Sequence, residues 1–119
     1  MKKLLLFLIL LVLAGCNEKY IFLSGDGDHW KGEYSANIEG DREDGKYTFR
    51  FKHGGSDTRF RKLNIVINNG ETVLKKSDYK GATIKIPSSC SGCSVTDDEK
   101  SIEVTIKWDD RNEETFYLK

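Results

Sequence analysis

Apolar and polar side chains alternate with a period of two along most of the chain. Between positions 30 and 38, Trp30, Tyr34, Ala36 and Ile38 share one parity, and charged or small polar residues take the other. The segments 46–52 and 102–108 repeat this pattern. Because successive side chains of a β-strand point to opposite faces, the pattern predicts strands that bury one face.

Shorter segments predict further strands at 58–60, 63–67, 72–75, 82–86 and 115–118, and the brief apolar stretch at 20–23 predicts a first edge strand. The tripeptide Asn68-Asn69-Gly70 predicts a tight hairpin, because Asn-Gly readily takes the positive φ values of a type I′ turn. We expect a charged turn at 39–45 and at most one helical turn at 77–80.

About eight or nine short strands without a sustained helical stripe predict an all-β fold. We expect an antiparallel β-sandwich with an immunoglobulin-like architecture, and the alternative is a closed eight-stranded barrel. The Cys…Trp…Cys spacing of true immunoglobulin domains is absent, so the prediction concerns architecture only.

The N-terminus differs in composition from the rest of the chain. Lys2 and Lys3 precede an unbroken apolar run at 4–13, which ends in small residues. A membrane-spanning helix needs roughly 20 apolar residues, so this run is typical of an export signal. The four residues Leu13-Ala14-Gly15-Cys16 resemble the lipobox of bacterial lipoproteins.

That resemblance implies a lipid anchor on Cys16. In this family a diacylglyceryl group is added to the Cys thiol, the signal is cut before the Cys, and the new amino terminus is often acylated. We therefore expect a signal helix at 1–15, a short tether at 16–19 and a single all-β domain at 20–119. Two acyl chains hold a protein stably on a membrane.

The same resemblance implies a place outside the cytoplasm, on the outer face of the cell membrane. Asn17 is not the Asp that resembles an inner-membrane retention signal, so in a two-membrane cell it would imply the outer membrane. The strands at 30–34 and 102–108 also resemble small uncharacterised lipoproteins of Bacillus-type Gram-positive bacteria. That second resemblance implies a single-membrane host and no particular activity.

The net charge of the chain bears on one class of partner, nucleic acids. Removing residues 1–15 leaves 104 residues with 17 basic and 19 acidic side chains. A slightly acidic domain of this size argues against a nucleic-acid-binding protein.

Cys90-Ser91-Gly92-Cys93 is the one local chemical motif. A β-turn brings its first and fourth residues within about 7 Å, which suits a disulfide. Export to an oxidising compartment favours that bond. The alternatives are a thiol–disulfide exchange site, which lacks the usual helix start, and a zinc site, which needs two further ligands.

A basic stretch runs from Arg50 to Lys62. If residues 53–56 form a four-residue hairpin loop, Phe51 faces Thr58, and Arg50 stands directly opposite Arg59 on the outer face. Like charges in this position destabilise a sheet, which favours an anionic ligand. The candidate ligand-binding residues are Arg50, Lys52, Arg59 and Arg61. The candidate partners are an anionic polymer of the cell envelope, a lipid head group or a surface protein.

No catalytic constellation stands out in the remaining chain. The acidic clusters at 41–44, 97–99 and 109–114 fall in predicted turns, where we expect solvated side chains. His29 and His53 stand alone, and we predict no metal site, no cofactor and no enzyme activity. The sequence predicts a membrane-tethered binding or interaction module; the alternatives are an inhibitor of an extracellular hydrolase such as lysozyme and a thiol–disulfide redox protein.

Overall fold

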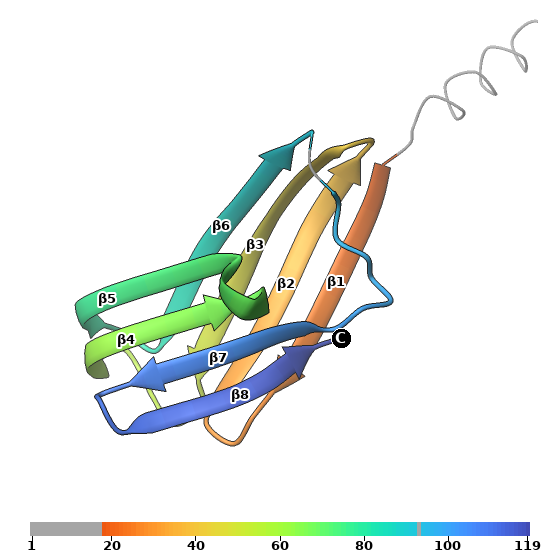
Figure 1. The fold of residues 1–119 in the computed structure, drawn as a ribbon. Coiled ribbons are helices and arrows are strands. Elements are labelled where there is room, and N and C mark those ends of the chain that lie inside the picture. The colour runs from red at the N-terminus through yellow and green to blue at the C-terminus, as the bar shows by residue number, and fades with distance from the viewer. Residues whose placement is uncertain (1–17, 93) are drawn as a thin grey trace, which may run out of the picture.

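The computed structural model describes residues 18–92 and 94–119, which form an all-β domain (Figure 1). Its strands are β1 (Glu18–Asp26), β2 (Trp30–Glu39), β3 (Arg42–Phe51), β4 (Arg59–Ile67), β5 (Thr72–Lys80), β6 (Thr83–Ser91), β7 (Ile102–Trp108) and β8 (Asn112–Leu118). A short 3-10 turn, η1 (Asn68–Gly70), joins β4 to β5. The predicted signal helix lies outside the described residues, as do Cys16 and Cys93.

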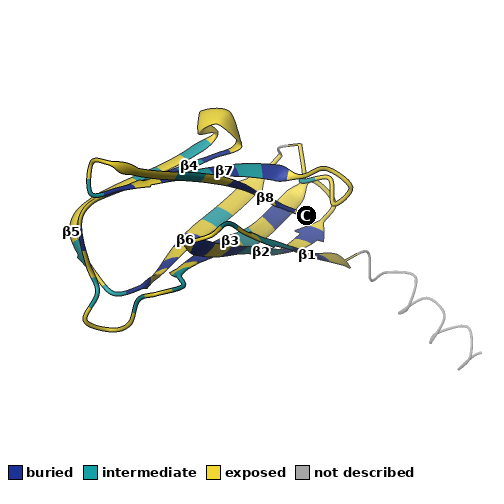
Figure 2. Ribbon diagram, turned by 90° about the horizontal axis from the view of Figure 1, so that it is seen from below, coloured by how far each residue is buried: buried dark blue, intermediate teal, exposed yellow. Residues whose placement is uncertain are grey.

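The strands form two four-stranded antiparallel sheets. Sheet A has the order β1-β2-β3-β6, and sheet B has the order β5-β4-β7-β8. The sheets lie one above the other, and their strands run in different directions (Figures 1 and 2). The predicted sandwich is confirmed, and the alternative closed barrel is not formed.

One long bent hairpin contributes two strands to each sheet. β3 pairs with β6 in sheet A, and the chain then continues so that β4 pairs with β5 in sheet B. At the corner, the Phe51 N–H donates to the Ala82 carbonyl at 2.8 Å, and the Gly81 N–H donates to the Thr58 carbonyl at 2.7 Å. Backbone pairing therefore continues around the bend from one sheet to the other.

This corner overturns one predicted pairing. Phe51 does not face Thr58, because residues 52–58 carry the chain from sheet A to sheet B. Within sheet B, β4 instead pairs with β5 on one side and with β7 on the other. A short turn joins β4 to β5. The prediction that β3 and β4 form a direct hairpin is wrong.

The turns of sheet B are set by residues that tolerate positive φ. Asn68 and Asn69 have φ values of 55° and 58°, and Gly70 has 98°. The predicted hairpin is confirmed, with a longer connection than two residues, because Ile67 pairs with Thr72. The segment 77–80, predicted as at most one helical turn, belongs to β5, since pairing with β4 extends the strand to Lys80.

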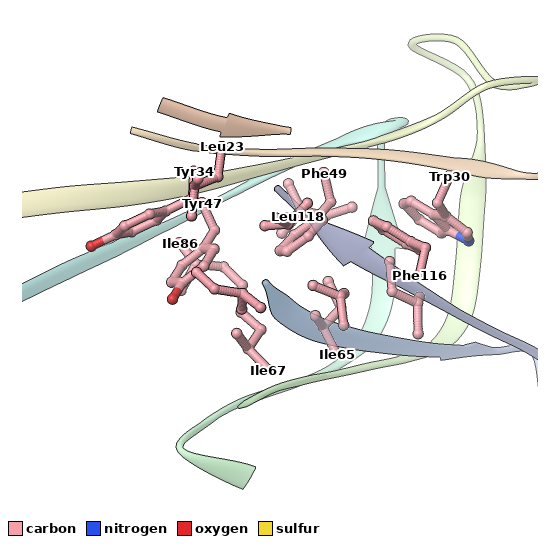
Figure 3. Close-up of a cluster of buried hydrophobic side chains, with 14 of the residues drawn as sticks. Leu23, Trp30, Tyr34, Tyr47, Phe49, Ile65, Ile67, Ile86, Phe116 and Leu118 are labelled. Atoms are coloured by element: carbon pink, nitrogen blue, oxygen red, sulfur yellow. The ribbon is translucent and has the colours of Figure 1, made fainter. Parts of the chain in front are cut away.

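The core fills the space between the sheets, and the alternating residues that the sequence singled out supply it (Figure 3). Trp30 and Phe49 of sheet A are fully buried, as are Ile65 and Ile106 of sheet B. Trp30 lies beneath the corner, with its ring 5.1–5.8 Å from the rings of Phe51, Phe60 and Trp108. The aromatic side chains thus fix the corner as well as the centre of the sandwich. Among the described residues, no helix has the length and apolarity to cross a bilayer.

The two sheets also meet where β1 passes the end of β8. The main chains of Ser24 and Lys119 exchange two hydrogen bonds, at 2.9 and 3.2 Å. A Cβ atom added to Gly25 would lie 1.9 Å from the Tyr117 carbonyl oxygen, so the backbones approach too closely for any side chain.

Gly25→Ala should therefore destabilise the domain by about 1–3 kcal/mol, because the backbone of β8 must move to admit the methyl group. Gly55→Ala is the matched control, since a Cβ at Gly55 meets nothing within 4 Å. Urea unfolding of the two variants measures the difference. Equal unfolding free energies would show that the two edges are not in contact.

Candidate functional site

The four predicted ligand-binding residues do not lie on one surface. Arg50 is on the outer face of sheet A, between Lys31 and Thr83. Arg59 is on β4 in the other sheet. The predicted Arg50–Arg59 pair is therefore wrong, for the same reason as the β3–β4 hairpin.

The other two predicted residues are held by carboxylates. The Lys52 ammonium lies 2.6 Å from an Asp26 oxygen and donates to the Gly27 carbonyl at 2.7 Å. The Arg61 guanidinium donates to Asp110 at 3.0 Å. Lys52 fastens the corner segment to the end of β1, and Arg61 fastens β4 to the β7–β8 turn, which leaves less of their charge for a ligand.

A different basic surface forms on sheet B, where β5 supplies the cations that the sequence prediction missed. Arg59 stands directly opposite Lys80 in the β4–β5 ladder. Asn64 stands between Lys75 on one side and Lys107 on the other. We define the cationic face by its exposed outward members: Arg59, Lys62, Lys75, Lys80 and Lys107.

Acids next to the cationic face are fewer than its cations: Glu113 stands opposite Lys107 in the β7–β8 ladder, and Asp110 lies beside Lys62. Lys62 lies 3.3 Å from an Asp110 oxygen, and Asp110 also receives Arg61. Within residues 18–92 and 94–119, no carboxylate lies within 4.0 Å of the charged nitrogens of Arg59, Lys75, Lys80 or Lys107. The Arg59–Lys80 pair therefore repels across the ladder without a counter-ion from this part of the chain.

The signal for the cationic face was present in the sequence. The Asn68–Gly70 turn fixes the register of the hairpin around it, and that register places Lys80 opposite Arg59. The prediction ended the strand at Lys75 and so left Lys80 outside it.

Buried carboxylates were also missed. Glu43 was expected in a solvated turn, but β3 begins at Arg42 and places Glu43 on the inward side with Tyr47. It accepts hydrogen bonds from the Tyr34 hydroxyl, from the Thr96 N–H at 2.6 Å and from the Thr96 hydroxyl at 2.7 Å. Glu43 thus fastens the loop that follows β6 to the strands of sheet A.

The pKa of Glu43 reflects two opposing effects. Burial raises the pKa, but the hydrogen bonds from Tyr34 and Thr96 outweigh it, and the pKa lies below its ordinary value. The pKa of the Tyr34 hydroxyl is raised, first by burial and then by its hydrogen bond to Glu43. The pair therefore holds one proton, on the tyrosine, at neutral pH.

Glu114 plays a similar part at the opposite end of sheet A. Its carboxylate accepts the backbone N–H groups of His29 and Trp30 at 3.0 Å and lies 2.7 Å from His29 Nδ1. Burial raises the pKa of Glu114, but these hydrogen bonds lower it by more, so the pKa lies below its ordinary value. Glu114 orders the β1–β2 turn, so the prediction that the acids at 109–114 are all solvated is wrong for this residue.

The fold brings the two histidines together, although each stands alone in the sequence. Their ring centroids lie 6.2 Å apart, and His29 also packs 5.5 Å from the Trp108 ring. The part of the chain that the structure describes holds no group of three or more His, Cys, Asp or Glu side chains able to bind a metal ion.

Of the three cysteines in the predicted features, only Cys90 lies among the described residues. Cys90 lies near the end of β6, opposite Glu43 of β3. Cys93 and the lipidation candidate Cys16 lie outside the described residues. The Cys90–Cys93 disulfide and the lipid anchor therefore stay predictions.

A pocket of about 310 Å³ opens between η1 and the loop before β7. Its wall includes Tyr47, Glu71, Ser94 and Lys100. Burial, followed by the charge of Glu71, raises the pKa of Tyr47 to about 12. Because the wall mixes acidic, basic and hydroxyl groups, it favours no single ligand charge, unlike the cationic face.

Comparison with known proteins adds no relative to this description: no protein-family model, no curated protein and no solved structure matches the chain.

Glu43→Gln should lower the unfolding free energy at pH 7 by about 1–3 kcal/mol, because both carboxylate oxygens accept hydrogen bonds and the amide replaces one of them by an NH2 group, which cannot accept. The effect depends on pH in a known direction. The folded-state pKa of Glu43 is depressed, so its contribution is present above the unfolded-state value of about 4.5 and is lost as the pH falls through the folded-state pKa.

The control for this variant is Glu33→Gln, at a partly exposed carboxylate on the outer face of sheet A. Urea unfolding at pH 7 and at pH 4 measures both proteins. The Glu43 variant should show a smaller difference between the two pH values than the wild-type protein does. An equal loss in both variants would contradict the role given to Glu43.

Proposed function

We propose that this chain is a lipid-anchored, non-enzymatic binding module outside the cytoplasm, which holds an anionic polymer of the cell envelope on its cationic face. The proposal rests most directly on the Arg59–Lys80 pair. These two side chains face each other across one ladder, where opposite charges would stabilise the sheet and like charges destabilise it. A bound polyanion would relieve that repulsion.

The charge is concentrated in one hairpin. From Arg59 to Lys80 the chain has two acids, Glu71 and Asp78. The basic residues of the same segment are Arg59, Arg61, Lys62, Lys75, Lys76 and Lys80. The mature chain as a whole is slightly acidic, so the field around this hairpin has the opposite sign to the net charge, which favours attraction of an anionic partner to this place.

The arrangement of the charges supports a polymer more than a single small anion. Arg59, Lys62 and Lys75, which faces Asn64, follow one another along the hairpin. At about 3.3 Å per residue the strand from Arg59 to Asn64 covers roughly 17 Å. Cations in a row fit the repeated charges of an extended phosphodiester or carboxylate chain, whereas one small anion would need them to converge.

The place of action is supported by the sequence alone. The export signal and the lipobox ending in Cys16 would deliver the domain to the outer side of the membrane. There an anionic polymer is a partner that a membrane-tethered module would meet without diffusing away.

Lys80→Glu should weaken binding to poly(glycerol phosphate) by about tenfold, because it replaces an attractive charge by a repulsive one. The same change should raise the unfolding free energy by about 0.2–1 kcal/mol, since it places opposite charges across the ladder. Because the variant should bind more weakly and yet be more stable, unfolding cannot be the cause of its weaker binding. Retention on an immobilised polymer over a salt gradient measures the first quantity, and urea unfolding the second.

Lys85→Glu is the matched control, because it makes the same charge change at an exposed position on the outer face of sheet A. It should keep most of the wild-type retention. Equal losses of retention in the two variants would show that binding depends only on the net charge of the protein. That result would contradict a site on the cationic face.

A further inference from the structure

We infer that the outer face of sheet A lies against the membrane, with Tyr20 and Phe22 at the lipid interface, so that the cationic face points away from the bilayer. The inference extends the proposed function and rests on its lipid anchor at Cys16. It is carried by the exposed side chains of β1 and by the short distance between β1 and that anchor.

β1 has two apolar sides where the other strands of sheet A have one. Ile21 and Leu23 point into the core and are 2% and 3% exposed. Tyr20 and Phe22 take the other parity and are 63% and 52% exposed. Two large aromatic side chains side by side on the outside of one strand indicate a contact surface, since each ring buries about 150–250 Å² when it is covered.

The side chains next to these rings are small and polar, and the surface that they form is shallow. Ser35 faces Phe22 in the ladder, and Asn37 faces Tyr20. A trough of about 270 Å³ runs from Tyr20 over these positions to Lys46 and Ser89. Aromatic rings at an edge beside hydroxyl, amide and ammonium groups are suited to a lipid interface, where rings lie at head-group level and an ammonium reaches a phosphate.

The charges of this face balance, so it has no strong repulsion toward a membrane of either sign. The outward positions of sheet A hold the basic residues Lys31, Arg42, Lys46, Arg50 and Lys85. They also hold the acidic residues Glu18, Asp26, Glu33, Glu39 and Asp44. The outward positions of sheet B have a basic excess instead, because Glu103 and Glu113 are the acids that β7 and β8 add beside the cationic face.

The tether limits where β1 can be. Tyr20 is four residues after Cys16 and Phe22 is six, so a fully extended chain places them at most about 14 and 22 Å from the acylated residue. The head-group region is only about 5–8 Å thick on each side of the bilayer. If β1 stood upright, Phe22 would rise out of this region, whereas a strand lying along the surface keeps both rings in it.

The sandwich then fixes the direction of the other face. The two sheets are stacked, and their outer faces point in opposite directions (Figure 2). With sheet A on the lipid, the cationic face of sheet B is turned toward the cell envelope. The anchor, the aromatic pair and the cationic face would thus act together to present basic residues to a polymer above the membrane.

The experiment uses the lipidated mature chain in phosphatidylcholine vesicles that contain lipids brominated near the head-group end of the acyl chain. Phe22→Trp places an indole at the proposed interface. Val73→Trp is the matched control, because Val73 is 47% exposed on the outer side of sheet B. The native Trp30 and Trp108 are buried in the core and give the same background in both variants.

Quenching of the introduced indole should be at least about threefold stronger for Phe22→Trp than for Val73→Trp. Equal quenching, or stronger quenching of the control, would overturn the inferred orientation. Failure of the chain to co-sediment with the vesicles would overturn the anchor and the orientation together. Adding Lys80→Glu to Phe22→Trp should leave the quenching unchanged. Quenching thus measures membrane contact independently of polymer binding, which Lys80→Glu weakens.

Discussion

Each strand of this domain places alternate side chains into one space between two sheets, and the burial of those side chains determines the rest of the structure. The bent hairpin satisfies this requirement with continuous backbone pairing around the corner, where Trp30 packs against Phe51 and Phe60. Its consequence for the surface is direct. Arg50 and Arg59, close in sequence, go to opposite faces of the sandwich, whereas Arg59 and Lys80 are brought side by side. The position of charge on this protein thus follows from how its core is closed.

Two carboxylates complete the scaffold at its ends. Glu43 holds the loop after β6 through Tyr34 and Thr96, and Glu114 holds the β1–β2 turn through the backbone of His29 and Trp30. Both are positioned by several donors, which explains why their pKa values are depressed despite burial. With the loops fastened in this way, the two outer sheet surfaces are the broad faces that the described part of the chain presents to other molecules.

The alternation of side chains was enough to predict the strands and the sandwich, because burial of one face is a local pattern that repeats every second residue. The pairing of the strands was harder to predict, because the residues around Gly54 and Gly55 fit a hairpin loop as well as they fit a corner between two sheets. The error moved the predicted ligand-binding surface. Arg59 was identified, but its partner Lys80 was missed, and Arg50 was placed beside it wrongly. Glu43 was missed because a charged segment at 39–45 resembles a turn, and only the strand register shows that one of its acids points inward.

Both the proposed binding role and the inferred orientation require that the domain is anchored to a membrane through Cys16. In the proposed function, Glu18 follows the acylated Cys16 by two residues, so the anchor would set the orientation of both faces. Mass spectrometry of the protein isolated from its own membranes tests this most directly. The account predicts an amino terminus at Cys16 with a diacylglyceryl group on its sulfur. An intact Met1, or an unmodified thiol at position 16, would contradict it.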